Sequence, residues 1–315
     1  MRIVVLAGGI GGARFLRGLK AAVPDAEVTV VGNTGDDIYL FGLKVCPDLD
    51  TVMYTLGGGI NEEQGWGRRE ETFVVKEELA AYGMEPTWFG LGDRDFATHI
   101  VRTQMLDAGY PLSQVTAALC DRWKPGVRLL PMTDQRVETH VVIEDEKGRR
   151  AVHFQEWWVR LRASVPALAI TPVGAQDARP APGVLEAIEA ADFVLFPPSN
   201  PVVSIGTILA VPGIGEALKP KTVVGVSPII GGAPVRGMAD ACLTAIGVET
   251  SAAAVAGFYG PELLNGWLVA PQDGPHFVSP GLEEMTVRAR PLLMSDPEAT
   301  RDLARAAVDL ALELS

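Results

Sequence analysis

Four aspartates stand close together near the N-terminus of the chain. Asp36 and Asp37 are adjacent, and Asp48 and Asp50 follow shortly after them. Adjacent carboxylates repel one another unless a cation or solvent relieves the repulsion, and Mg²⁺ typically binds one or two carboxylates together with substrate phosphates. The pattern therefore predicts a Mg²⁺ site with Asp36, Asp37 and Asp50 as ligands. The alternatives are a solvated turn at Asp36-Asp37 and an N-cap role for Asp50 at a helix over Thr51–Leu56.

A glycine-rich turn precedes the aspartates. The sequence Gly8-Gly9-Ile10-Gly11-Gly12 follows an apolar run and opens a helix. Glycines at that place let the backbone approach a phosphate, and the start of the helix supplies N–H groups and partial positive charge. We therefore expect Gly9, Gly11 and Gly12 to contact a phosphate. The alternative is a tight turn that needs glycine only for its backbone angles.

The glycine turn does not match two common nucleotide motifs. A dinucleotide fingerprint starting at Gly9 would need a small residue where Arg14 stands, and Asn33 replaces the acidic residue that would bind the ribose. The lysine-containing phosphate loop is also absent from the sequence. An NAD-dependent oxidoreductase and a P-loop kinase are therefore disfavoured.

Polar segments recur later in the chain. The segment LGDRDFATH, residues 91–99, contains Arg94, which suits a phosphate or a ligand hydroxyl, the alternative being a surface ion pair. His99 in the same segment is by default a structural histidine. The segments at 197–206 and 226–232 each follow a predicted strand, which suits recognition of a nucleotide or phosphate. Alternatively, the prolines and glycines of these segments only end the strands and shape the loops that follow.

Strands alternate with helices towards both ends of the chain. Strands are expected at residues 2–7, 27–32, 193–196 and 222–226, and helices at 13–22, 184–191, 207–218 and 238–247. Further helices are expected at 50–56, 70–82, 97–108, 113–123 and 297–314, and a β-hairpin at 137–144 and 150–159. This order predicts an α/β fold, a doubly wound Rossmann-like parallel sheet with a helical and β-hairpin insertion.

We expect the whole chain, residues 1–315, to form a single compact unit. Residues 1–60 and 184–260 are predicted to form the Rossmann-like core with its nucleotide and metal loops. The helical and β-hairpin insertion is predicted at 61–183, and C-terminal strands and a helix at 261–315.

The composition excludes several classes of protein. The chain has 315 residues, of which 48% are hydrophobic and 21% charged, which argues against disorder. A net charge of −12 disfavours nucleic acid as a partner. The three cysteines are far apart and fit a reducing compartment. No run of apolar residues is long enough to cross a membrane, so we expect a cytoplasmic protein that does not bind a membrane.

The motifs taken together resemble the 2-phospho-lactate transferase family of coenzyme F-420 biosynthesis. The resemblance rests on GGIGGARFL, NTGDD, PDLDT, LGDRDFATH, PSNP followed by SIG, and VSPIIGG, in that order. It covers the chain from the first strand to about residue 260. It implies Mg²⁺-dependent transfer of a phosphorylated small acid from a guanosine diphosphate-linked donor to the ribityl 5′-hydroxyl of 8-hydroxy-5-deazaflavin, with release of GMP, in a homodimer.

The resemblance also implies roles for individual residues. Asp50, Asp36 and Arg94 are the expected catalytic residues, and Asp50 and Arg94 are expected to contact the deazaflavin. Ser199, Asn200, Ser204 and Gly232 are expected on the guanosine diphosphate side. The remaining expected ligand contacts are Gly9, Gly11, Gly12, Asn33, Thr98 and His99. Because arginine and alanine are abundant and lysine is scarce, an actinobacterial origin and a phosphoenolpyruvyl donor are favoured over a phospholactyl donor.

A different function on the same fold is the main alternative. The family has relatives that bind nucleotide sugars and act as regulators without catalysis. The PDLDT and LGDRD segments resemble the transferase branch more closely. Binding of a nucleotide sugar without turnover would identify the regulator.

Overall fold

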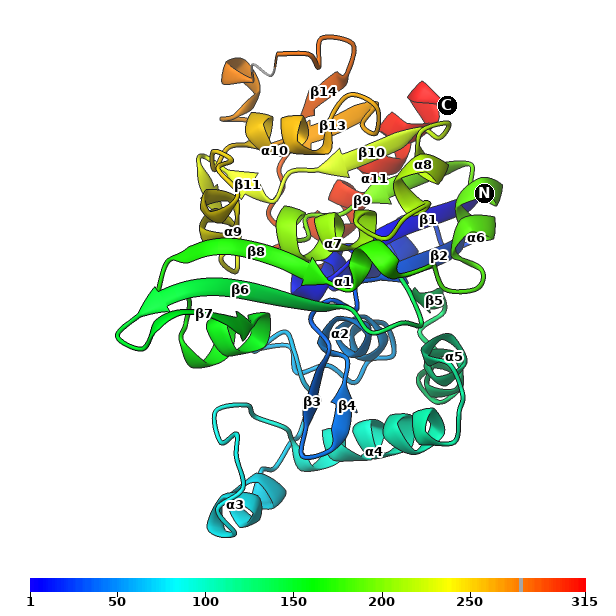
Figure 1. Cartoon of the computed structure of the whole chain (residues 1–315). Helices are drawn as coiled ribbons and strands as arrows, with labels where there is room; N and C mark the ends of the chain where they lie inside the picture. Colours follow the sequence, from blue (N-terminus) through cyan, green and yellow to red (C-terminus); the bar gives the residue numbers. More distant parts are fainter. Residues whose placement is uncertain (278–279) are drawn as a thin grey trace.

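The computed structural model describes residues 1–277 and 280–315, and a seven-stranded parallel sheet is its centre (Figure 1). The strands run in the order β14-β13-β10-β9-β1-β2-β5. They are β1 (Arg2–Ala7), β2 (Glu27–Gly32), β5 (Arg128–Pro131), β9 (Phe193–Phe196), β10 (Val223–Val226), β13 (Gly266–Val269) and β14 (Thr286–Ala289). Since β1 lies between β2 and β9, the strand order reverses at β1, as in doubly wound dinucleotide-binding folds.

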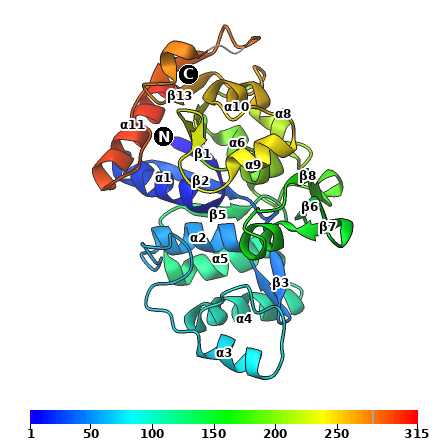
Figure 2. The ribbon, with the colours of Figure 1, turned by 90° about the vertical axis from the view of Figure 1, so that its left-hand side faces the viewer.

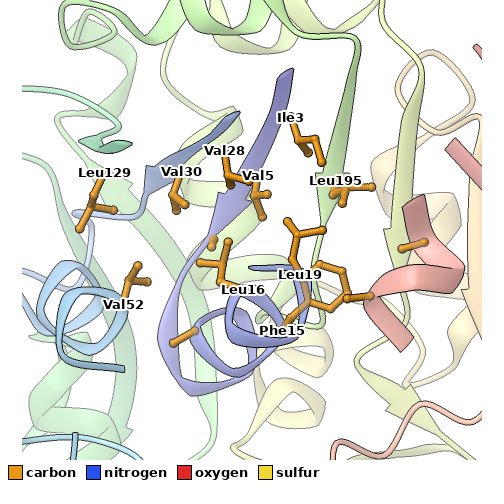
Figure 3. Close-up of a cluster of buried hydrophobic side chains, with 14 of the residues drawn as sticks. Ile3, Val5, Phe15, Leu16, Leu19, Val28, Val30, Val52, Leu129 and Leu195 are labelled. Carbon is orange, nitrogen blue, oxygen red and sulfur yellow. The ribbon is translucent and has the colours of Figure 1, made fainter. Parts of the chain in front are cut away.

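Helices cover both faces of the sheet because buried residues on its strands alternate between two apolar clusters. Ile3 and Val5 of β1 face one cluster, and Val4 and Leu6 face the other. The first cluster, part of which is drawn in Figure 3, contains residues of α1 (Gly9–Ala22), α2 (Pro47–Leu56), α5 (Leu112–Trp123) and α11 (Pro297–Leu314). The second contains residues of α6 (Val184–Ala190), α7 (Gly206–Leu209), α8 (Ile214–Leu218), α9 (Ala239–Ala245) and α10 (Ala252–Tyr259).

The middle of the chain extends away from the sheet. Helices α3 (Val74–Ala81) and α4 (Asp93–Asp107) lie at the far end of the molecule from β13, with the hairpin of β3 (Ile38–Leu40) and β4 (Leu43–Val45) reaching towards α4 (Figure 2). None of the α3 residues is buried. A separate three-stranded sheet, β7-β6-β8, projects to one side and consists of β6 (Glu138–Asp145), β7 (Gly148–His153) and β8 (Ala167–Val173).

Short elements complete the connections. A π-helix, η1 (Glu156–Arg160), lies between β7 and β8, and another, η3 (Pro201–Ile205), leads into α7. The remaining elements are η2 (Ala175–Asp177), β11 (Ile229–Ile230), β12 (Ala233–Pro234) and η4 (Gly274–His276).

The predicted fold class is confirmed, and the structure corrects several element boundaries. The strand at 193–196 and the helix at 297–314 have the predicted bounds. The helix predicted at 50–56 begins at Pro47, so Asp50 lies inside its first turns and Cys46 is the N-cap residue. The N-cap alternative for Asp50 was therefore wrong. The strand predicted at 150–159 ends at His153, where the chain turns into η1.

One strand of the main sheet comes from the predicted insertion. β5 belongs to residues 61–183 and pairs in parallel with β2. Its short run RLLP carries no periodicity that separates it from a loop, which is why the sequence pattern missed it. Among the described residues, no helix is long and apolar enough to cross a membrane.

Candidate functional site

The glycine turn packs against the loop that follows β9. Gly9 has φ of +64°, a conformation that favours glycine. A Cβ atom on Gly11 would lie 2.3 Å from the carbonyl oxygen of Pro198, and one on Gly12 would lie 2.7 Å from Ser199 Oγ. These two glycines therefore allow α1 to approach the β9 loop closely. This is a structural need for glycine, and their predicted phosphate contact stays a prediction.

Ser199 and Asn33 join the ends of three neighbouring strands. Ser199 Oγ donates to the Gly8 carbonyl oxygen at 2.8 Å and accepts from the Gly8 N–H at 3.2 Å. The side-chain amide of Asn33 donates to Asp48 Oδ2 at 2.8 Å and to the Val203 carbonyl oxygen at 3.1 Å. The carboxyl ends of β1, β2 and β9 are thus held together, where doubly wound folds bind their ligands.

Asp48 is a member of this site that the sequence analysis did not select. Its Oδ1 accepts the Gly9 N–H at 2.8 Å, and its Oδ2 accepts from Asn33. Burial raises its pKa to about 6, although these hydrogen bonds oppose the rise. The signal that identifies Asp48 is its place one residue after Pro47 on the first turn of α2, beside the start of α1.

Asp36 is buried next to Asp48 and has no cation against it in the described chain. Burial, followed by the charge of Asp48, raises the pKa of Asp36 well above its ordinary value, and hydrogen bonding by Asn33 opposes the rise. Asp36 Oδ1 has no hydrogen-bond partner. This carboxyl group therefore has unused capacity to bind a cation or a proton.

Asp37 belongs to a second group of contacts, although it is the neighbour of Asp36 in the chain. Lys44 Nζ lies 3.0 Å from Asp37 Oδ2, and the Cys46 thiol donates to the same oxygen at 3.2 Å. Burial raises the pKa of Asp37, and the charge of Lys44 opposes the rise. His153 Nε2, from the three-stranded sheet, lies 3.0 Å from the Asp37 carbonyl oxygen. The insertion therefore helps to hold the loop that carries both acids.

Asp50 forms a buried ion pair with Arg102 of α4. Burial raises the pKa of Asp50, and the positive charge of Arg102 opposes the rise. Asp50 Oδ2 lies 3.8 Å from His99 Nδ1 and accepts no hydrogen bond. A network then leads outward from the pair, since Asp95 Oδ2 lies 3.3 Å from His99 Nε2 and Tyr54 donates to Asp95 Oδ1 at 2.6 Å.

The other predicted ligand residues are not gathered at one point. Thr98 is buried on α4, beside His99. Arg94 at the start of α4 is half-exposed and lies 3.6 Å from Glu70 Oε2. Asn200 is the N-cap of η3, where its side chain accepts the Val202 and Val203 N–H groups. Ser204 is buried against Gly8, since a Cβ on Gly8 would lie 2.7 Å from Ser204 Cβ. Gly232 lies between β11 and β12 with φ of +79°.

Three buried carboxylates have the chemistry of Mg²⁺ ligands. Asp36, Asp37 and Asp50 each leave one buried carboxylate oxygen without a hydrogen bond, and carboxylate oxygen is the ligand type that Mg²⁺ prefers. No group of three or more His, Cys, Asp or Glu side chains is arranged to hold a metal ion, within residues 1–277 and 280–315. The residues therefore fit an ion that one or two carboxylates share with substrate phosphates.

Comparison with known proteins gives consistent results. The model of a family described as 2-phospho-L-lactate transferase CofD matches residues 3–287. Curated proteins called phosphoenolpyruvate transferase are similar over 100% of this chain and 99% of their own length in Thermobifida fusca, at 73% identity, and Streptomyces coelicolor, at 71% identity. A protein of the same name from Mycolicibacterium smegmatis is 58% identical over 99% of both chains.

A solved structure has the same fold. The crystal structure of protein BH3568 from Bacillus halodurans superimposes with a TM-score of 0.62 at 17% identity, over 98% of this chain and 99% of that chain. At this identity the likeness concerns the fold alone.

Proposed function

We propose a specific reaction for this chain, which belongs to the 2-phospho-L-lactate transferase CofD family and is a transferase. It transfers a phosphoenolpyruvyl group from a guanosine diphosphate-linked donor to the ribityl 5′-hydroxyl of 7,8-didemethyl-8-hydroxy-5-deazariboflavin, a step of coenzyme F-420 biosynthesis. The enolpyruvyl donor is favoured over the phospholactyl donor because the similar actinobacterial proteins are called phosphoenolpyruvate transferases. Those names also favour a transferase over a regulator that only binds nucleotide sugars.

The single observation that supports this reaction best is the set of buried acids at the reversal of strand order. Asp36 and Asp48 are buried next to each other, and Asp50 lies with Asp48 on the first turn of α2. Phosphoryl transfer depends mainly on positioning and on neutralising the charge of the phosphates. Mg²⁺, when bound, supplies that neutralisation. We propose Asp36 as its main ligand, with Asp37 as a further candidate, and assign Asp50 to proton transfer because its Oδ1 is already paired with Arg102.

In this proposal, side chains of the protein accept the proton of the acceptor and contact the two substrates. Asp50 Oδ2, which accepts no hydrogen bond, takes the proton of the acceptor hydroxyl as that oxygen attacks the phosphorus atom bearing the acid. The bond from this phosphorus to the bridging oxygen of GMP breaks, and GMP leaves with the electron pair. Arg94 contacts the acceptor. Ser199, Asn200, Ser204 and Gly232, in the loops after β9 and β10, face the donor.

The reaction is tested by mixing purified protein, acceptor, donor and Mg²⁺ and by measuring GMP release and the mass of the product. We expect Asp36→Asn to lower turnover by about 100-fold or more, a range typical of a lost charge-stabilising group. Asp309→Asn, which changes an exposed acid on α11, is the matched control. If GMP release requires neither the acceptor nor Asp36, the assignment of the site is wrong.

The donor acid is decided by direct competition. The phosphoenolpyruvyl and phospholactyl donors are supplied together, and the two products are separated by their masses. We expect the enolpyruvyl product to predominate. The homodimer is a proposal from the family resemblance, and light scattering of the purified protein tests it. The cytoplasmic location is a proposal from the three separated cysteines, which fit a reducing compartment.

A further inference from the structure

Helices α3 and α4 lie next to each other at the end of the molecule far from β13 (Figure 2), and each lacks a capping side chain at its own N-cap position. Gly92, the N-cap residue of α4, has no side chain, and the ring of Phe73, the N-cap residue of α3, has no oxygen to accept a hydrogen bond. The first N–H groups of a helix have no partner within the helix, so their acceptors must come from elsewhere. Here they come from the start of the neighbouring helix.

Asp93, the first residue of α4, caps α3. Its Oδ1 accepts the Val75 N–H at 2.9 Å, and its Oδ2 accepts the Val74 N–H at 3.1 Å and the Thr72 hydroxyl at 2.6 Å. The backbone N–H of Asp93 in turn donates to the Thr72 carbonyl oxygen at 2.8 Å. The start of α3 is therefore tied to the start of α4 by polar contacts.

Glu71, which precedes α3 in the chain, caps α4 in return. Its Oε2 accepts the Arg94 N–H at 2.8 Å. A Cβ atom on Gly92 would overlap the Glu71 carboxyl group, so the absence of a side chain at position 92 allows this carboxylate to reach the helix. Residues 71 and 92 are therefore matched to each other, although they are distant in the chain.

The backbone of Arg94 is held on both sides. Glu71 accepts its N–H, and Arg68 Nη1 donates to its carbonyl oxygen at 2.7 Å. The guanidinium group lies 3.6 Å from Glu70 Oε2, and about half of the Arg94 side chain is exposed. A fixed backbone with an accessible charged end suits a side chain that must meet a ligand from a defined direction.

The residue after Arg94 is linked to the site around Asp50. Asp95 Oδ2 lies 3.3 Å from His99 Nε2, and His99 Nδ1 lies 3.8 Å from Asp50 Oδ2. The start of α4 therefore sets the place of Arg94 relative to the carboxylate that is proposed to take the proton of the acceptor.

Helix capping alone explains these contacts less well. None of the α3 residues is buried, so the apolar core does not depend on this helix for its packing. A helix this short is marginal in water by itself, and the polar contacts with Asp93 stabilise its first turn. A segment that buries no apolar surface, but bonds to the backbone of Arg94 and of the residue before it, is better explained by an effect on Arg94.

We propose that Glu71 and Asp93 are positioning residues, which hold the start of α4 so that Arg94 meets the acceptor. The inference rests on the proposed function, in which Arg94 contacts the acceptor. In this arrangement neither carboxylate touches the substrate, and each acts through the backbone around Arg94. Their removal should therefore weaken binding of the acceptor and leave binding of the donor unchanged.

The test uses the full chain and two measurements. The change in absorbance of 7,8-didemethyl-8-hydroxy-5-deazariboflavin on binding gives its Kd, and GMP release gives the KM of each substrate. Glu71→Ala is expected to raise the Kd and KM of the acceptor about tenfold, because misplacement of a positioning group can cost up to about 100-fold. The KM of the donor should not change.

Three further variants complete the series. Glu71→Gln keeps an oxygen that can accept the Arg94 N–H, so it should recover most of the affinity for the acceptor. Asp93→Ala should act in the same direction as Glu71→Ala, and it tests the inference if Glu71→Ala fails to fold. Glu78→Ala, which changes an exposed glutamate of α3, is the matched control and should bind the acceptor as the wild type does.

Combination with Arg94→Ala shows whether the carboxylates act through Arg94. If they do, adding Glu71→Ala to Arg94→Ala should not raise the Kd of the acceptor further, because the effects of residues that act through one another are not additive. The inference is overturned if Glu71→Ala and Asp93→Ala both bind the acceptor as the wild type does. It is also overturned if Glu71→Ala weakens binding equally with and without Arg94.

The same series separates this inference from the proposed function. If Arg94→Ala weakens acceptor binding and Glu71→Ala does not, the inference fails and the proposed contact of Arg94 stands. If Arg94→Ala itself leaves acceptor binding unchanged, that contact is wrong and the inference fails with it. Absence of acceptor binding by the wild type would contradict the proposed function and, with it, this inference.

Discussion

Asp37 and Asp50 each lie against a buried cation, whereas Asp36 and Asp48 lie near each other and have no cation partner in the described chain. Lys44 pairs with Asp37 and Arg102 pairs with Asp50. The folded protein therefore already bears the desolvation penalty of burying these paired charges. Asp36 and Asp48 also have raised pKa values, because burial disfavours both charges and the charge of Asp48 adds to the rise at Asp36. A bound cation would stabilise Asp36 most, because its Oδ1 has no hydrogen-bond partner, whereas Asp48 already accepts hydrogen bonds from Gly9 and Asn33.

This difference sharpens the magnesium prediction. The sequence predicts Asp36, Asp37 and Asp50 as ligands, and in the structure the surroundings of these three acids are unequal. Asp37 already has a lysine 3.0 Å away, and Asp48 has none in the described residues. Asp36 would therefore bind Mg²⁺ with fewer existing contacts to break than Asp37, because its Oδ1 has no hydrogen-bond partner and, among the described residues, no lysine or arginine forms an ion pair with it.

The largest expected loss of stability comes from replacing Arg102, the cation that pairs with the buried Asp50. Arg102→Gln leaves Asp50 charged and buried without its partner, which typically costs about 3–5 kcal/mol of stability. Equilibrium unfolding in urea measures the loss. Arg149→Gln, at the surface, should change stability by less than about 0.5 kcal/mol. A loss below about 1 kcal/mol for Arg102→Gln would show that the pair is not structurally important. Adding Asp50→Asn to Arg102→Gln should restore part of the loss.

Asp36 and Asp48, which have no cation partner in the described residues, should make the free energy of unfolding depend on pH. The folded protein holds protons on Asp48 and Asp36 at pH values where the unfolded chain has released them, so the free energy of unfolding falls as pH rises from about 4 through 6. The rise in the Asp48 pKa from 3.8 to about 6 corresponds to about 3 kcal/mol. Unfolding at pH 5 and pH 8 in EDTA measures about half of the Asp48 part of this fall, because the unfolded chain has already released most of its aspartate protons at pH 5.

Asp36→Asn is the variant that isolates this effect. It removes a titrating group whose pKa burial raises well above its ordinary value, so its stability should fall less than that of the wild type between pH 5 and 8. Parallel pH profiles for the two proteins would contradict the assignment. Added Mg²⁺ should reduce the difference between them, if it binds these acids.

A smaller effect is expected where α1 meets the β9 loop. Gly11→Ala would place a Cβ 2.3 Å from the Pro198 carbonyl oxygen, and overpacking of this kind typically costs about 1–3 kcal/mol. Gly215→Ala on α8, whose Cβ would meet nothing within 4 Å, should be neutral or stabilising by about 0.4–1 kcal/mol. Thermal and urea unfolding of both variants test this. Equal stability of the Gly11→Ala and Gly215→Ala proteins would show that the close approach of Pro198 does not require glycine at position 11.

The smallest loss of stability is expected for substitutions of His153, which contacts the loop that carries Asp37. His153→Phe removes the ring N–H that lies 3.0 Å from the Asp37 carbonyl oxygen, which typically costs about 0.5–1.5 kcal/mol. His153→Gln keeps a donor and should lose less. His140→Phe on the adjacent strand, which makes no contact with that carbonyl, serves as control. If all three variants unfold alike, the contact does not stabilise the loop.

Local patterns were sufficient to predict many, though not all, of the elements that build the core. The buried run Phe193–Phe196 and the amphipathic helix Pro297–Leu314 each have a clear period and clear ends. The glycine turn and the acidic segments were also located correctly at the carboxyl ends of β1 and β2. No local sequence pattern in these segments identifies the distant residues that they contact in the folded protein.

The partners were missed because they are distant in the chain. Asp50 and Arg102 are in different helices, and their pairing depends on how α4 packs. For the same reason the sequence did not separate Asp36 from Asp37, although they are neighbours with different contacts. It also attributed Gly11 to ligand approach, because the close passage of Pro198 is visible only when β1 and β9 are side by side.

The hydrogen bonds between Ser199 and Gly8 span 191 residues, and this has a consequence for synthesis of the chain. During translation, β1 is made long before β9, so one edge of β1 stays unpaired until the later strand has left the ribosome. Parallel pairing over such separations is slow, and an unpaired apolar edge promotes aggregation. The site around the glycine turn is therefore among the last parts of the protein to form, and its assembly depends on the nascent chain staying free of premature association.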